Sequence, residues 1–271
     1  MEMKTIVYQS YQGNETPAWL ETCMQTVKDW TELKGFDYQR QDNFFAYVPE
    51  WYIDKAQGKI NVIADLARLE ISRKFLKEGY EQTIWMDADV VVFAPEKLNI
   101  DTIEEYLVCR EVWLDTEDGK NFGEGTLFCQ EKVTNSLVYF TQKNRFLDFY
   151  IYATESIVKN QTGRLSRLAV STKFLSRLDE IMALPVFPNM GLFSPILMHA
   201  IVEEQNEIIK LYAKALKSPI YATNLCFSFR NQFHKGIMVN DELFEQVIDK
   251  LISTQGETIN RYFSPAVVNP T

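Results

Sequence analysis

The sequence is poor in the residues that build zinc and redox sites. Its 271 residues include two histidines and four cysteines, and no two cysteines form a C-x-x-C pair. The cysteines are Cys23, Cys109, Cys129 and Cys226. A zinc site or a redox motif built on such a pair is therefore excluded. We expect the four thiols to be small hydrophobes of a reduced compartment.

The chain also lacks a long apolar run and an excess of positive charge. No segment reaches transmembrane length, and the first residues contain no stretch typical of a signal peptide. We therefore expect a cytoplasmic protein. The formal net charge of −9 and the pI near 4.9 argue against a chain that coats nucleic acid. A hydrophobic content of 46% is enough for a sizeable core.

What the chain does contain is an alternation of strand and helix patterns. Strands are expected at residues 5–10, 36–40 and 83–93, and helices at residues 20–30 and 63–77. Gly79 follows the second helix at the position where a left-handed C-cap is favoured. This order predicts an α/β domain with a largely parallel sheet, in which ligands bind outside the carboxyl ends of the strands.

Two carboxylates, Asp87 and Asp89, lie one residue apart in the third expected strand. Because side chains alternate along a strand, both are expected on the same face. Two like charges on a buried strand require a positive partner. A divalent cation that also binds substrate phosphates is such a partner. A lone Asp-x-Asp also occurs as an ordinary strand end, so its neighbours decide between these interpretations.

A second charged pair precedes this strand. Asp65 and Arg68 are three positions apart on the expected helix and therefore share a face. They are either an ordinary ion pair within the helix or part of a binding site. In a site, the aspartate would accept hydrogen bonds from ribose or sugar hydroxyls, and the arginine would suit a phosphate.

Taken together, Ala64-Asp65-x-x-Arg68, the helix, Gly79 and Asp87-Ala-Asp89 resemble the core of the GT-A fold glycosyltransferases. The resemblance is to the group whose sugar-binding region contains a DXD motif, which includes family 32 mannosyltransferases and is related to family 8 and the clostridial glucosylating toxins. The strand Ile6-Val-Tyr8-Gln9-Ser10-Tyr11 is similar to the Ile-His-Gln-Thr-Trp strand of that group. Met190-Gly191-Leu-Phe193-Ser194 is loosely similar to its later Gly-Pro-x-x-x-Thr segment.

The resemblance implies one GT-A catalytic domain over residues 1–271, Rossmann-like, with a mostly parallel mixed sheet flanked by helices and with helical additions. Residues 1–130 would form the nucleotide-sugar-binding half and residues 131–271 a helix-rich acceptor-side half. The implied activity is the transfer of a sugar from a UDP- or GDP-sugar to a carbohydrate or lipid-linked acceptor, with retention and with Mn²⁺ or Mg²⁺. Synthesis of surface polysaccharide or glycoconjugate is the implied setting.

The resemblance also implies roles for single residues. Asp89 would be the direct metal ligand, and Asp87 would contact the metal shell and the ribose or sugar. Asp65 and Arg68 would hold the donor sugar and diphosphate. Further contacts to the donor or nucleotide are expected from Tyr8, Gln9, Ser10 and Glu124.

Three of the residues considered for the site have open alternatives. Glu124 lies between two glycines, where a simple turn is equally consistent with the sequence. A third metal ligand is expected late in the chain, and His234 in a polar segment is the candidate. The other histidine, His199, lies on an apolar helix and is expected to pack in the core.

Residues 139–177 differ from the rest of the chain, because they contain seven basic and two acidic residues and many aromatics. Ordinary helix faces over an aromatic core explain this composition. The alternative is a peripheral surface that contacts an anionic membrane or a phosphate-bearing, lipid-linked acceptor.

Two other functions remain open for the Asp-x-Asp strand. A haloacid-dehalogenase-like phosphatase uses the first aspartate of such a motif as its nucleophile. A sugar- or metal-binding module of the same fold would bind without catalysis. Nucleotide release, phosphate release and binding without turnover distinguish the three functions.

Overall fold

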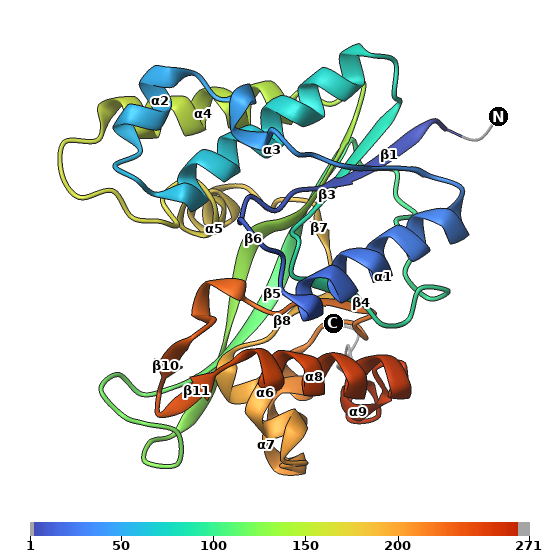
Figure 1. Cartoon of the computed structure of the whole chain (residues 1–271), viewed down its shortest axis with the longest axis vertical. Coiled ribbons are helices and arrows are strands. Elements are labelled where there is room, and N and C mark those ends of the chain that lie inside the picture. Colours follow the sequence, from blue (N-terminus) through green and yellow to red (C-terminus); the bar gives the residue numbers. More distant parts are fainter. Residues whose placement is uncertain (1–2, 265–271) are drawn as a thin grey trace, which may run out of the picture.

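A computed structural model of the chain describes residues 3–264, which contain a central six-stranded sheet (Figure 1). Its strand order is β2-β1-β3-β6-β5-β7. The strands are β1 (Thr5–Gln9), β2 (Asp37–Arg40), β3 (Gln82–Met86), β5 (Tyr106–Thr116), β6 (Leu127–Thr141) and β7 (Val186–Phe187). β1 pairs in parallel with β2 and β3, whereas β6 is antiparallel to β3 and β5. The expected α/β fold with a mixed sheet is confirmed.

The remaining strands within the described residues form two smaller sheets. One contains β4 (Val90–Val92), β9 (Ala222–Asn224) and β8 (Met190–Leu192), and the other is the hairpin of β10 (Gln232–His234) and β11 (Ile237–Val239). The strand expected at residues 83–93 is therefore wrong as a single element. β3 ends at Met86, a turn covers residues 87–89, and β4 pairs with β9 instead of continuing the central sheet. Asp87 and Asp89 lie in this turn.

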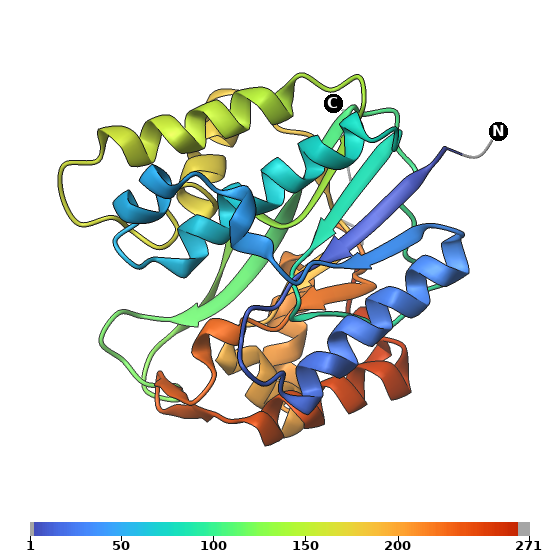
Figure 2. The same cartoon turned by 45° about the horizontal axis from the view of Figure 1, so that its top comes forward.

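Helices cover both faces of the central sheet, as Figures 1 and 2 show. They are α1 (Ala18–Lys34), α2 (Glu50–Lys55), α3 (Ile60–Lys77), α4 (Phe146–Asn160), α5 (Thr172–Ile181), α6 (Pro195–Val202), α7 (Asn206–Ala215), α8 (Asp241–Thr254) and α9 (Glu257–Asn260), with short 3-10 turns η1 (Phe44–Tyr47) and η2 (Phe227–Phe229). Both helices expected from the sequence lie within α1 and α3. Gly79 follows α3 with φ +99°, a conformation that glycine adopts without strain.

Side chains of β1 and β3 alternate between two cores because successive residues of a strand face opposite sides of the sheet. Tyr8 and Trp85 pack in the core with α3, α4 and α5. Val7 and Ile84 pack on the other face, in a core that includes side chains of α1 and β4. The central sheet is thus buried on both faces, and a ligand reaches it at a strand end.

The predicted division between residues 130 and 131 falls inside β6, so both halves contribute to one sheet. All four cysteines are free, with Cys23 and Cys109 buried and the other two half-buried. No helix within residues 3–264 is long and apolar enough to cross a bilayer.

Candidate active site

The carboxyl ends of β1 and β3 lie side by side because the two strands are parallel, with Tyr8 opposite Trp85. Gln9 at the end of β1 donates through Nε2 to the backbone carbonyl of Asp87 at 3.0 Å. The antiparallel β6 brings Ser136 to the same place, where its carbonyl accepts from the backbone N–H of Asp87 at 2.8 Å. Both neighbouring strands therefore fix the turn that carries the two aspartates.

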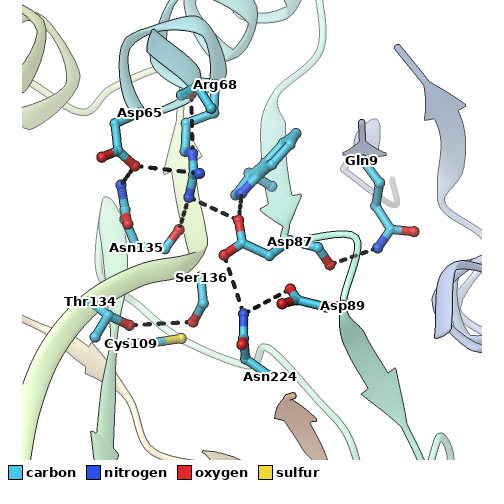
Figure 3. A network of polar contacts seen from close by, with 12 residues as sticks. Gln9, Asp65, Arg68, Asp87, Asp89, Cys109, Thr134, Asn135, Ser136 and Asn224 are labelled. Atoms are coloured by element: carbon cyan, nitrogen blue, oxygen red, sulfur yellow. Dashed lines mark hydrogen bonds and ion pairs between the residues drawn. The ribbon is translucent and has the colours of Figure 1, made fainter. Parts of the chain in front are cut away.

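Arg68, one member of the charged pair on α3, contacts Asp87 in this turn (Figure 3). Its Nη1 lies 2.9 Å from Asp87 Oδ1 and also donates to the Asn135 carbonyl at 2.7 Å. Its Nη2 lies 3.4 Å from Asp65 Oδ1, which also accepts from Asn135 Nδ2. Asp65 and Arg68 are 3% and 6% exposed, so they form a buried network. The ion pair within the helix is therefore present, and it is buried and extends to Asp87.

Asn224 at the end of β9 connects the two aspartates of the motif (Figure 3). Its Nδ2 donates to Asp87 Oδ2 at 3.3 Å and to Asp89 Oδ1 at 3.0 Å. The backbone N–H of Phe227 donates to Asp89 Oδ2 at 2.7 Å. The two carboxylates therefore converge although they lie in a turn and not on one strand.

Negative charge exceeds positive charge in this network. Asp65, Asp87 and Asp89 share one guanidinium, that of Arg68. Burial raises the pKa of all three carboxyls, and burial together with the charge of Asp87 raises the pKa of Asp89 to about 7. A bound cation would remove this excess of negative charge.

The oxygen donors of Asp87 and Asp89 suit Mg²⁺ or Mn²⁺, which bind carboxylates together with phosphates and water. Residues 3–264 contain no group of three or more His, Cys, Asp and Glu side chains arranged to hold a metal ion. Any such cation would be held by the two carboxylates alone, with substrate or water completing its coordination.

A cavity of about 840 Å³ opens at this edge of the sheet. Asp65, Arg68, Asp87 and Asp89 line it, as does the predicted Ser10. Ser10 donates through Oγ to the carbonyl of Gln41 at 2.8 Å. The structure thus brings the four central residues of the prediction and Ser10 to one cavity.

Tyr8 and Gln9 do not line this cavity, and their expected contact with a nucleotide is corrected. Both side chains are 0% exposed, because β1 is an inner strand of the sheet. Tyr8 Oη donates to the Arg68 carbonyl at 2.5 Å and lies 2.6 Å from Ser72 Oγ. Gln9 bonds to the Asp87 carbonyl and accepts from Tyr38 Oη at 3.0 Å. Both residues position the groups that do line the cavity.

Glu124 lies in an exposed turn of the β5–β6 connection and does not line the cavity. Its Oε2 accepts from the backbone N–H of Asn121 at 3.0 Å, which closes the turn. The expected donor contact is therefore wrong, and the simple turn is what the structure contains.

The two histidines lie in different surroundings. His234 on β10 lines the cavity, with Nε2 3.7 Å from Asp115 Oδ1, and burial lowers the pKa of its imidazole. It belongs to no metal-binding group within residues 3–264, so its role as a third ligand stays a prediction. His199 on α6 packs against the ring of Phe122, in the wall of a second cavity.

Two acidic residues of the cavity wall, Glu111 and Asp115, were not expected from the sequence. Glu111 on β5 is 1% exposed and accepts a hydrogen bond from Ser136 Oγ at Oε1. Its Oε2 has no hydrogen-bond partner among the described residues. Burial raises the pKa of Glu111 to about 8. The polar run Thr134-Asn135-Ser136, directly before the apolar residues 137–140 of β6, was the available signal for this part of the site.

Aromatic rings form another wall of the cavity. Trp113 and Phe229 stack with centroids 5.7 Å apart and an interplanar angle of 25°, and His234 meets Phe229 edge-on at 4.8 Å. Lys132 Nζ lies 5.4 Å from the centroid of Trp113. The cavity thus combines a charged side at β1 and β3 with an aromatic side at β5 and β10.

No protein-family model and no curated protein matches this sequence. Among solved structures, the chain is similar to a glycosyltransferase involved in the glycosylation of the major capsid of PBCV-1. The identity is 11% and the TM-score 0.46, over 90% of this chain and 98% of that chain. It is also similar to the apo-form glycosyltransferase GlyE of Streptococcus pneumoniae TIGR4. There the identity is 10% and the TM-score 0.41, over 99% of this chain and 66% of that chain. At these values the likeness carries no argument about activity, which has to come from the side chains.

Proposed function

We propose that this protein is a metal-dependent glycosyltransferase that moves a sugar from a UDP- or GDP-sugar to an acceptor hydroxyl, with retention. One observation carries the proposal. Asp65, Arg68, Asp87 and Asp89 form one largely buried network, which Asn224 extends from Asp87 to Asp89, at the carboxyl ends of parallel strands, and they line a cavity of about 840 Å³. This volume lies within the range of ligand and cofactor pockets.

Asp87 and Asp89 are the residues that would hold Mn²⁺ or Mg²⁺. When bound, such an ion neutralises the charge of the leaving diphosphate. Asn224 fixes both carboxylates through one amide, and the N–H of Phe227 fixes the second oxygen of Asp89. The chain therefore presents the two ligands in a defined orientation, which preserves affinity for the ion.

Asp65 and Arg68 would act on the donor. Asp65 lines the cavity, and a carboxylate there would accept a hydrogen bond from a sugar hydroxyl. Arg68 holds Asp65 and Asp87 at fixed positions through its guanidinium. The nucleoside would lie toward Ser10 and Tyr11, which line the cavity after β1.

The aromatic side of the cavity supports a carbohydrate acceptor. The half-buried ring of Phe229, which stacks on the buried Trp113, would offer apolar surface to the C–H face of a sugar ring. Lys132 and Asp115 beside them supply a hydrogen-bond donor and an acceptor for hydroxyls. In a retaining transfer the leaving diphosphate can accept the proton of the attacking hydroxyl, so the chain need not supply a base.

The phosphatase alternative would use Asp87 as the nucleophile. Asp87 Oδ1 accepts from Arg68 and from Trp85 Nε1 at 2.7 Å, and Oδ2 accepts from Asn224 at 3.3 Å. These bonds are equally compatible with a metal ligand and with a nucleophile, so the following assay separates the two functions.

Incubation with a panel of UDP- and GDP-sugars, Mn²⁺ and simple sugar acceptors tests the proposal through the release of nucleotide diphosphate. Release with at least one donor, together with a glycosylated product, is the expected result. Phosphate release from monoesters without nucleotide release would instead identify a phosphatase. Binding of a nucleotide sugar without turnover would identify a non-catalytic module. The anomeric configuration of the product, read by NMR, decides between retention and inversion.

A further inference from the structure

The stretch 139–177 does not form one basic and aromatic face, and that part of the prediction is corrected. Tyr139, Phe140, Phe146 and Tyr150 are buried in the core, so most of its aromatic content serves packing. Lys143 and Arg145 precede α4, whereas the other basic residues begin in the last turn of this helix. The basic residues from Lys159 onward lie beside a second segment of the chain, and the two segments together determine the local charge.

Two loops lie side by side beyond the end of α4. Lys55 Nζ donates to the carbonyl of Lys159 at 3.0 Å. The amide of Gln57 donates to the Gly163 carbonyl at 3.2 Å and accepts from the backbone N–H of Leu165 at 3.2 Å. The loop that follows α4 extends past α2 at the left edge of Figure 1. The segments 55–64 and 159–173 therefore form one surface.

The segments 55–64 and 159–173 contain basic residues and no acidic ones, although the whole chain has a net charge of −9; the exposed Asp54 precedes Lys55 at the edge of this surface. We call it the basic surface, and its cations are Lys55, Lys59, Lys159, Arg164, Arg167 and Lys173. Within residues 3–264, none of them lies within 4.0 Å of a carboxylate. Their charges are thus not neutralised by ion pairs with the protein.

Two exposed apolar side chains accompany these cations. Ile60 follows Lys59 and is 63% exposed, and Leu168 follows Arg167 and is 37% exposed. Both line the mouth of the 840 Å³ cavity. Cations that flank exposed aliphatic residues are the composition of a surface that binds anionic lipid, since the aliphatic residues gain nothing from a nucleic-acid backbone.

We propose that the basic surface binds an anionic lipid bilayer, with Ile60 and Leu168 entering the interfacial region. Bilayer binding itself does not depend on the proposed function. The orientation of the cavity toward a lipid-linked acceptor, described next, does rest on the proposed glycosyltransferase function. Because Arg167 and Leu168 also line the cavity, a bilayer-bound protein would open its cavity toward the headgroups, where a lipid-linked acceptor would lie.

Co-sedimentation with vesicles tests this proposal without any substrate. The protein should sediment with phosphatidylcholine vesicles that contain phosphatidylglycerol, and not with phosphatidylcholine alone. Added salt should weaken the binding, because it screens exposed charges. Replacing Lys59, Lys159 and Arg164 by glutamine should lower the partition constant roughly a hundredfold, since each basic residue contributes about a factor of five.

A matched variant controls for net charge. Lys28→Gln, Lys210→Gln and Lys214→Gln together remove the same charge from α1 and α7, outside the basic surface, and should leave binding unchanged. Ile60→Ser should weaken binding about tenfold without a change of charge. Thermal unfolding of each variant verifies that it is folded.

Three results would overturn the proposal. The first is a lack of binding to anionic vesicles at low salt. The second is an equal loss of binding in the control triple variant. The third is tighter retention by a DNA duplex than by the vesicles, with no effect of Ile60→Ser, which would identify a nucleic-acid surface. A bilayer-binding protein that fails the nucleotide-release assay would refute the proposed function and leave this proposal standing.

Discussion

Replacing Glu111 by glutamine tests whether the cavity wall contains a neutral carboxyl. Glu111 is 1% exposed, and its Oε2 has no partner within the described residues. Burial, which disfavours the charged form, raises its pKa from 4.5 to about 8. A pKa difference of one corresponds to about 1.4 kcal/mol, so full ionisation of Glu111 costs the folded protein roughly 5 kcal/mol.

The raised pKa fixes the sign of the pH dependence. The folded protein holds this proton more tightly than the unfolded chain does, so the contribution of Glu111 to stability is complete below about pH 4.5. It is lost as the pH rises toward 8. Glutamine keeps the acceptor for Ser136 and does not ionise. Glu111→Gln should therefore match the wild type near pH 5 and exceed its free energy of unfolding by roughly 3–5 kcal/mol near pH 8.

Urea denaturation at a series of pH values measures this difference, because the midpoint and slope give the free energy of unfolding at each pH. Glu245→Gln, an exposed change on α8, is the matched control and should give a curve parallel to the wild type. Parallel curves for the wild type and Glu111→Gln from about pH 5 to pH 8 would refute the reasoning, since Glu111 would then ionise without cost.

Three further substitutions probe the network. Arg68→Met leaves buried carboxylates without their cation and should lower the free energy of unfolding by roughly 3–5 kcal/mol in urea denaturation; a loss below about 1 kcal/mol would contradict the buried network. Tyr8→Phe removes one buried hydroxyl and should cost about 1–2 kcal/mol. Calorimetric binding of UDP- or GDP-sugar should be unchanged in this variant, and a large loss of affinity would restore Tyr8 as a nucleotide contact. Asn224→Ala removes the donor shared by Asp87 and Asp89 and should weaken Mn²⁺ binding, followed by electron paramagnetic resonance, about tenfold or more. Unchanged affinity would separate Asn224 from the metal site.

The sequence predicts the first half of the fold well because local patterns dominate there. The helices α1 and α3 and the strands β1 and β2 all have clear periodicity and turn residues. The break between β3 and β4 has no local signal, because residues 83–93 form one apolar run apart from the two aspartates. Only β9, more than a hundred residues later, determines that β4 leaves the central sheet.

The candidate site divides in a similar way. Asp65, Arg68, Asp87 and Asp89 could be named from the sequence, because two motifs lie close together in the chain. Glu111 and Asn224 could not, since long-range strand pairing alone brings β5 and β9 to this edge.

The error at Tyr8 has a different cause. A polar atom on an inner strand is often satisfied by protein groups, and the hydroxyl of Tyr8 bonds to α3 instead of a ligand.

The most direct test of the proposed function is the rate of nucleotide-diphosphate release from the best donor of the panel. We would measure it for the wild type and Asp89→Asn, each with Mn²⁺ and with a chelator. Asp249→Asn, an exposed change on α8, serves as the matched control. The expected result is a loss of about a hundredfold or more in Asp89→Asn and in the chelated wild type, with thermal unfolding still cooperative and the control fully active. Undiminished release from Asp89→Asn, or from the wild type in chelator, would contradict a metal site at Asp87 and Asp89.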